Sequence, residues 1–94
     1  MPLELRHLRT LLALAETGNL SAAAERVHLT QSALSHQIKA LENEYGIELF
    51  QRKSTPPRFS AAGQRLLRLA QEVLPQVRAA ERALRRGRKR IAGS

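Results

Sequence analysis

The sequence of 94 residues contains no cysteine, no tryptophan and no aspartate, and aromatic residues make up only 3% of it. Without cysteine there can be no disulfide bond, no thiolate metal site and no cysteine nucleophile. No apolar run approaches the length that is needed to cross a bilayer, and the N-terminus lacks the pattern of a signal peptide. These absences fit a protein of the cytoplasm.

A catalytic or metal site is not expected either. The three histidines, His7, His28 and His36, have no carboxylate or thiol at ligand spacing, and the sequence has no glycine-rich phosphate loop. We therefore predict that the protein is not an enzyme and holds no metal ion. His28 is predicted to be a turn residue that packs beside the core.

Hydrophobic residues make up 43% of the chain, which is enough for one domain with a modest core. Because aromatic residues are scarce, Leu, Ile, Val and Ala must fill that core. This mixture has few β-branched runs and is typical of helices. The sequence therefore predicts a mainly α fold.

Positive charge dominates, since 16 Lys and Arg residues stand against 8 Glu residues, giving a net charge of +8. Five of the bases lie in the last ten residues, which contain no acid: Arg85, Arg86, Arg88, Lys89 and Arg90. A positive excess suits a polyanionic partner, first a nucleic acid and second an anionic membrane. A solvated basic tail explains the same charges and stays open as an alternative.

Residues 20–46 have the pattern of two helices joined by a tight turn at residues 28–30. Ser21 is predicted to cap the shorter, Ala-rich helix, and Thr30 to cap the longer one, which Gly46 ends. Two helices joined by so short a turn must cross at a steep angle, and small Ala side chains let them pack closely. This is the geometry of a helix-turn-helix, in which the second helix lies in the DNA major groove.

The second of these helices has two different faces. Its apolar residues recur at helical spacing and predict a buried stripe. They are Leu34, Ile38, Leu41 and Tyr45. Another side carries hydrogen-bonding groups and one cation: Gln31, Ser32, Ser35, His36 and Lys39. Short polar side chains let a helix approach base edges or phosphates, although an ordinary solvated face explains this helix equally well.

Residues 3–17 are predicted to form the first helix, which Gly18 ends. Helical spacing predicts one apolar stripe and one polar side. The stripe consists of Leu5, Leu8, Leu11, Leu12 and Ala15. The residues expected to lie largely outside it are Arg6, His7, Arg9 and Thr10.

Residues 47–60 change in character, because two short apolar ends flank a basic loop that contains proline. We interpret them as a small β-hairpin, a wing, with its tip near residues 54–57. Phe50 and Phe59 would anchor its base on the core. The bases expected to point outward are Arg52, Lys53 and Arg58. An irregular surface loop with solvated bases remains the alternative.

Ser60 is predicted to cap a long final helix. The apolar residues of this helix follow a four-three rhythm: Leu66, Ala70, Val73, Val77, Ala80 and Leu84. Such a seam favours a partner helix, because packing on the chain's own core explains its first turns but not its second half. Pro75 predicts a kink near residues 71–75, and residues 85–94 are expected to be frayed or disordered.

Four motifs stand out along the chain: GNLSAAAE at residues 18–25, TQSALSHQIKALE at 30–42, LFQR at 49–52 and FSAAG at 59–63. Together with the leucines of residues 3–17 they resemble the DNA-binding domain of LysR-type transcriptional regulators. The likeness covers residues 3–84. Residues 32–37 and 52–59 are most similar to the methionine-biosynthesis regulators of that family.

The resemblance implies a winged helix-turn-helix at residues 1–60, a linker and dimerisation helix at residues 61–84 and a basic tail at residues 85–94. Family members bind double-stranded DNA as homodimers on interrupted palindromes, often paired into tetramers. The positions that match base-contacting ones are Gln31, Ser32, Ser35 and His36. The positions expected to hold the DNA backbone are Thr30, Lys39, Arg52, Lys53 and Arg58, with Arg52 as the wing arginine. The four-three seam of the final helix would form the dimer.

The chain departs from the family pattern in two respects. His36 stands where many members carry arginine, so that a bidentate contact to guanine is replaced by a weaker, pH-sensitive one. The C-terminal effector domain is missing, so the chain is expected to be a fragment, or an unusually short protein, that senses no small molecule and holds no cofactor. For a methionine-type regulator, the implied effector of that missing domain is homocysteine.

We thus expect a bacterial, cytoplasmic, nucleoid-associated protein that binds specific double-stranded DNA, with methionine-biosynthesis genes as targets implied by the likeness. The alternative is a helical dimerisation or adaptor module whose basic surface is incidental. A membrane-binding role is disfavoured, because the final helix has no Trp or Phe on its apolar side.

Overall fold

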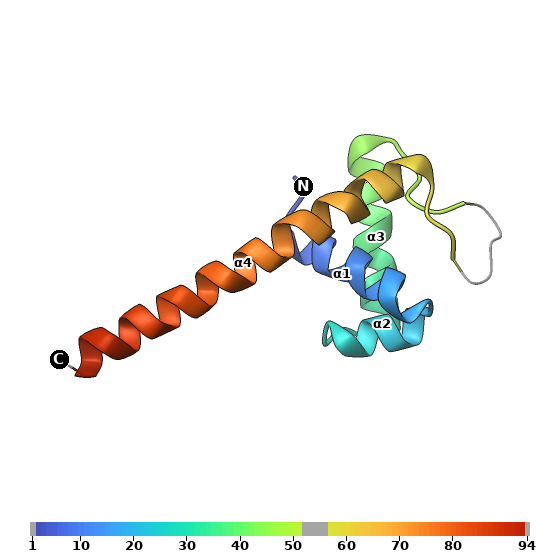
Figure 1. Cartoon of the computed structure of the whole chain (residues 1–94). Helices are drawn as coiled ribbons and strands as arrows, with labels where there is room; N and C mark the ends of the chain where they lie inside the picture. Colours follow the sequence, from blue (N-terminus) through green and yellow to red (C-terminus); the bar gives the residue numbers. More distant parts are fainter. Residues whose placement is uncertain (1, 52–56, 94) are drawn as a thin grey trace.

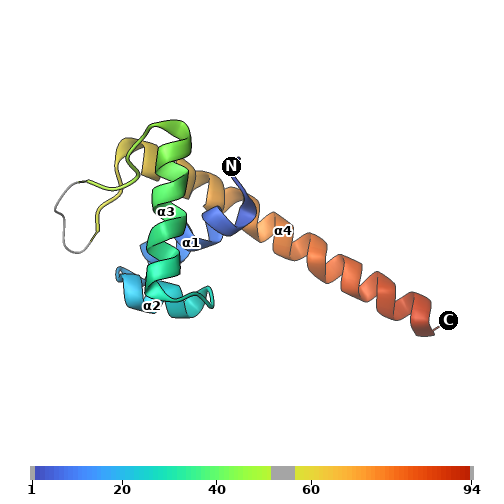
Figure 2. The same ribbon diagram turned by 180° about the vertical axis from the view of Figure 1, so that it is seen from behind.

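The computed structural model describes residues 2–51 and 57–93, with the backbone alone at residues 88–93. In this part of the chain four helices follow one another: α1 (Leu5–Thr17), α2 (Leu20–Arg26), α3 (Gln31–Tyr45) and α4 (Ala61–Gly93). The first three gather at one end of α4, and the rest of α4 projects away from them (Figures 1 and 2). The predicted mainly α architecture is confirmed.

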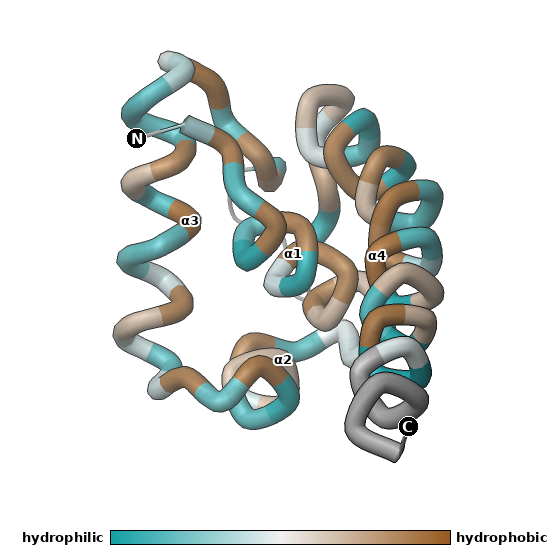
Figure 3. Tube along the Cα trace, turned by 90° about the vertical axis from the view of Figure 1, so that its left-hand side faces the viewer, coloured by the Kyte–Doolittle hydropathy of each residue, from teal (hydrophilic) through white to brown (hydrophobic). Residues whose placement is uncertain are grey.

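Helix α1 is the centre of the helical body. It contacts the three other helices and lies between α3 and α4, with α2 across its far end (Figure 3). Because α1 has neighbours on several sides, more of it is buried than one apolar stripe. His7 and Thr10, which we predicted outside the stripe, are 3% and 1% exposed, whereas Leu5 is 39% exposed. That part of the prediction was therefore wrong.

The helix ends follow from a few residues. Gly18 and Gly46 adopt left-handed φ values of 69° and 62°, which end α1 and α3 as predicted. Thr30 caps α3, and its side chain accepts a hydrogen bond from the Ala33 N–H at 3.0 Å. The cap of α2 is Asn19 rather than the predicted Ser21, because the helix begins two residues earlier than a Ser21 cap implies, at Leu20.

His28 lies in the turn between α2 and α3 and has a left-handed φ of 61°. It is the one residue other than glycine with such a φ in the described part of the chain. Its side chain is exposed, so the prediction that it packs beside the core was wrong. A left-handed residue reverses the chain within two or three positions. His28 therefore acts in the fold through its backbone.

The segment between α3 and α4 forms the root of the predicted wing. Phe50 and Phe59 make an isolated antiparallel bridge, their ring centroids lie 5.0 Å apart, and the Gln51 N–H donates to the Arg58 carbonyl at 2.8 Å. Neither flank forms a strand within the described residues, where the predicted hairpin is seen as this one bridge. The predicted tip falls mostly on residues 52–56, which lie outside the description. We refer below to Leu49–Gln51 and Pro57–Ser60 as the wing root.

Helix α4 belongs to the core in its first half. Ala70 and Leu74 are 0% and 2% exposed and pack with Leu8 of α1. Residues on both sides of the predicted boundary at residue 61 therefore pack together. Gly63 lies so close to the Leu49 carbonyl oxygen that a Cβ atom there would overlap it.

Beyond this contact α4 continues without interruption past Pro75, although proline supplies no N–H for the helical ladder. It also continues to Gly93, so residues 85–93, which were expected to be frayed or disordered, are helical; Ser94 lies outside the described residues. The reason is composition, because Ala, Arg and Lys are among the best helix formers. None of the described helices has an apolar stretch that could span a membrane.

Candidate nucleic-acid interface

Helix α3 separates its apolar and polar side chains onto opposite sides. Leu34 and Leu41 are 0% and 3% exposed, and Ile38 is half-buried against the same core. The last member of the predicted stripe differs: Tyr45 is 52% exposed, and its hydroxyl accepts a hydrogen bond from the Leu3 N–H at 3.1 Å. The stripe thus buries its first three members, and Tyr45 was wrongly predicted as core.

The other side of α3 carries every residue that we predicted to contact bases. Gln31, Ser32, Ser35 and His36 are all exposed, as are Thr30 before them and Lys39 after them. Residues four apart on a helix are neighbours, so these side chains form two adjacent rows. One row contains Gln31, Ser35 and Lys39, and the other contains Ser32 and His36. We call these five side chains the reading face.

The reading face is positive and sterically open. Lys39 is the one lysine or arginine among the five, and the first acid that follows along α3 is Glu42. Serine hydroxyls can donate and accept hydrogen bonds, and a glutamine amide can do both at once. The reading face can therefore meet the mixed donor and acceptor pattern of base edges in a major groove.

A hydrogen bond that sequence reasoning missed orients α3 on α1. The buried Thr10 hydroxyl donates to the Gln37 side-chain oxygen at 2.6 Å. Gln37 is half-buried and comes directly after His36, so this bond fixes the rotation of α3 next to the reading face. The available signal was a threonine within the leucine-rich part of the first helix, but nothing in the spacing identifies its partner.

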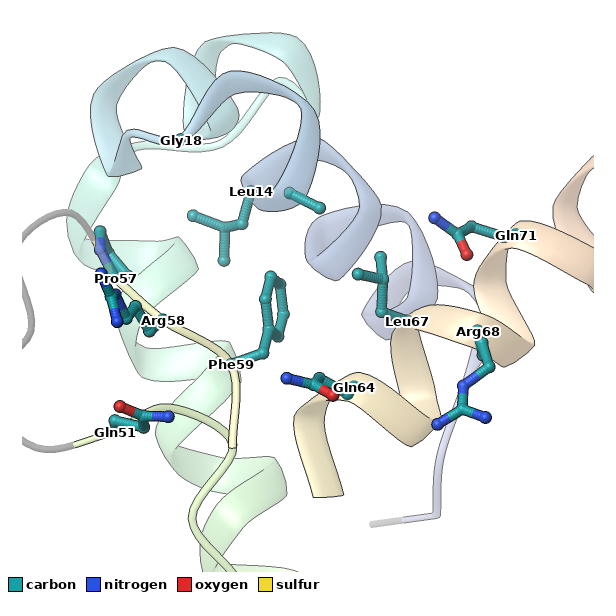
Figure 4. A pocket seen from close by; sticks show the side chains of 11 residues that line it. Leu14, Gly18, Gln51, Pro57, Arg58, Phe59, Gln64, Leu67, Arg68 and Gln71 are labelled. Atoms are coloured by element: carbon teal, nitrogen blue, oxygen red, sulfur yellow. The ribbon is translucent and has the colours of Figure 1, made fainter. Parts of the chain in front are cut away.

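The wing root also carries an exposed cation, Arg58. Phe59 lies between Leu14 of α1 and Leu67 of α4, whereas the Arg58 side chain lies beside Pro57, away from α4 (Figure 4). Arg58 is exposed, as predicted. Arg52 and Lys53, the other predicted wing cations, lie outside the described residues.

A second missed feature joins the wing root to α3. The Glu42 carboxylate accepts a hydrogen bond from the Leu49 N–H at 2.8 Å. On the far side of the same residue, the Leu49 carbonyl accepts from the Ser60 N–H at 2.9 Å. Glu42 stands at a helical position where a solvated acid is ordinary, so no pattern in the sequence indicates this contact.

One histidine in the body has a perturbed titration. Burial lowers the pKa of His7 below its ordinary value of 6.5, with the charge of Arg6 as a smaller cause. The neutral Nδ1 of His7 accepts a hydrogen bond from the Glu4 N–H at 2.9 Å, which completes a capping box at the start of α1. His7 thus has a structural role away from the reading face. Among the described residues no group of three or more possible ligands could hold a metal ion.

The structure divides the predicted dimerisation seam into two parts. Leu66, Ala70 and Val73 pack against the chain's own core. The remaining members lie on the projecting half of α4: Val77 is half-buried, Ala80 is exposed and Leu84 is 72% exposed. We call Val77, Ala80 and Leu84 the outer seam, because the described part of the chain covers Val77 only partly and leaves Ala80 and Leu84 exposed.

Known proteins are similar to this chain in sequence and in the arrangement of the helices. Residues 5–64 match the family described as "Bacterial regulatory helix-turn-helix protein, lysR family". The HTH-type transcriptional regulator MetR of Haemophilus influenzae is 63% identical over 91 residues, which are 97% of this chain and 29% of the relative. The chain thus spans less than a third of that regulator's length.

Solved structures agree. The BenM DNA-binding domain in complex with catB site 1 DNA superposes with a TM-score of 0.79 at 34% identity, over 89% of this chain and 90% of that one. The CbnR DNA-binding domain in complex with DNA gives a TM-score of 0.72 at 34% identity, over 90% and 99%. On the match of residues 5–64, which are more than half of the sequence, this chain belongs to the LysR family of bacterial regulatory helix-turn-helix proteins.

Proposed function

We propose that this chain is the DNA-binding part of a LysR-type transcriptional regulator and that it binds specific double-stranded DNA. The observation that carries the proposal is the division of α3, whose apolar side is buried while Gln31, Ser35 and the rest of the reading face are exposed. In this account α3 enters the major groove. Its side chains contact base edges, and Lys39 and Arg58 contact phosphates.

The proposal extends to assembly and target. Two chains bind an interrupted palindrome as a homodimer that is held through the outer seam of α4, since a twofold protein reads a twofold site. The likeness to regulators named MetR supports control of methionine-biosynthesis genes, in the bacterial cytoplasm. Homocysteine is then the effector that we propose for a domain other than this one.

The direct test is selection of bound duplexes from a random pool, followed by sequencing. The account predicts one enriched motif with two inverted half-sites about one helical turn apart, or a multiple of that spacing. It also predicts that log affinity falls with log salt by about 0.9 for each phosphate contact. If no duplex of any sequence is retained in dilute buffer, the proposal fails, and the outer seam would favour a dimerisation or adaptor module instead.

A further inference from the structure

The last turn of α3 holds the wing root through the side chain of Glu42. Its carboxylate accepts the hydrogen bond from the Leu49 N–H at 2.8 Å, and its backbone carbonyl accepts another from the Ile47 N–H at 3.1 Å. The Leu49 side chain is fully buried in the core. The carboxylate therefore joins α3 to the buried end of the wing root.

The same point is held from the opposite side by the start of α4. Besides the bond from the Ser60 N–H to the Leu49 carbonyl, the Ser60 hydroxyl donates to the Glu48 carbonyl at 2.6 Å. That hydroxyl also accepts from the Gly63 N–H at 3.1 Å. Leu49 is thus hydrogen-bonded on one side to α3 and on the other to Ser60, the residue before α4. The Phe50–Phe59 bridge begins at the next residue.

We propose that Glu42 is a positioning residue for DNA recognition, which sets the wing root at a fixed distance from the reading face. The inference rests on the proposed function. Under it, α3 and the exposed Arg58 contact the same duplex at two separate places, so the protein binds well only if their separation matches the DNA. Apolar side chains of α3 also pack against the wing root, but the Glu42 side chain hydrogen-bonds its backbone, and it does so through one oxygen acceptor.

Two variants isolate that acceptor. Glu42→Gln and Glu42→Ala remove the same negative charge, but only glutamine keeps a side-chain oxygen that can accept from the Leu49 N–H. Any general gain in DNA affinity from the lost charge is therefore equal in both. Each variant is titrated against the selected duplex and a random duplex over a series of salt concentrations, alone and combined with Arg58→Ala.

We expect Glu42→Gln to keep the salt dependence of the parent chain. Glu42→Ala should lower the slope of log affinity against log salt by about 0.9, the value for one phosphate contact, and should weaken both duplexes by a similar factor. In the Glu42→Gln background, Arg58→Ala should reduce DNA affinity as much as it does in the parent chain. In the Glu42→Ala background it should reduce DNA affinity little further, because the wing root is already displaced there. Base discrimination should stay within about twofold of the parent, since the reading face is untouched.

Equal behaviour of Glu42→Gln and Glu42→Ala would overturn the proposal, as would an Arg58→Ala loss of the same size in every background. If urea unfolding shows that Glu42→Ala does not fold, Glu42→Met takes its place with the same expectations, because it keeps the length of the side chain without a strong acceptor. Failure of the parent chain to bind any duplex would instead reject the proposed function.

Discussion

The two halves of α4 share one apolar rhythm but have different surroundings. In the first half Ala70 and Leu74 are at most 2% exposed, because α1 covers them. In the second half Leu84 is 72% exposed and no part of the described chain covers it. Spacing alone therefore tells which residues share a face of a helix, whereas the cover of that face depends on where the helix lies in the fold.

Leucine-to-alanine substitutions in the two halves should have the most unequal effects. Leu74→Ala removes a buried side chain and is expected to lower the free energy of unfolding by about 2–5 kcal/mol. Leu84→Ala should change it by less than about 0.5 kcal/mol under conditions where the chain is monomeric. Urea unfolding followed by circular dichroism compares the two. Similar losses in dilute monomer would show that our division of α4 is wrong.

At the start of the packed half, Gly63 sharpens the comparison. An alanine there would overlap the Leu49 carbonyl oxygen and press on Phe59, so Gly63→Ala should destabilise the chain by about 1–3 kcal/mol despite its better helix propensity. A Cβ atom added at Gly87, also in α4, would meet open space, so Gly87 serves as the matched control. Gly87→Ala should leave the unfolding midpoint unchanged or raise it slightly. A stabilising Gly63→Ala would mean that the close approach of α4 to Leu49 does not hold.

Thr10 tests the joint between α1 and α3. Thr10→Val keeps the shape of the side chain but removes the hydroxyl that donates to Gln37, so the free energy of unfolding should fall by about 1 kcal/mol. Thr10→Ser keeps the donor and should retain the Gln37 bond. A double-mutant cycle with Gln37→Ala measures the coupling, and a coupling of zero would show that the bond does not stabilise the chain.

The smallest expected effect is a pH dependence from His7. Because burial lowers the pKa of His7 in the folded chain below 6.5, the folded state binds fewer protons than the unfolded state just below that pH. The His7 contribution to stability is thus complete above pH 6.5 and declines as the pH falls through that value. Urea midpoints between about pH 7 and pH 5 should fall more steeply for the parent than for His7→Gln. Parallel curves would contradict this account of His7.

Much of the fold follows from local signals in the sequence. The caps at Thr30 and Ser60 and the helix ends at Gly18 and Gly46 depend on neighbouring residues alone, and each was predicted correctly. The reading face was predictable for the same reason, since residues 31–39 need only one helix to be brought together. Of the predicted wing bases, Arg58 is exposed as expected, whereas the flanks that were predicted as strands form one bridge within the described residues.

What the sequence could not provide are the contacts between distant segments. The bonds from Thr10 to Gln37 and from Leu49 to Glu42 join ordinary polar residues that no spacing rule pairs. His7 and Thr10 are buried because α1 is surrounded by other helices, which a single periodic pattern does not express. Burial of the first seam residues likewise depends on the docking of α4 against α1.

The central claim is that the reading face of α3 discriminates between DNA sequences. The most direct measurement compares the affinities of the parent chain, Gln31→Ala and the distant control Gln76→Ala for the selected duplex and a random duplex at one salt concentration. The account predicts that Gln31→Ala loses about 1–3 kcal/mol of discrimination while Gln76→Ala loses none. Equal weakening of both duplexes by Gln31→Ala, or no change with either, would contradict it.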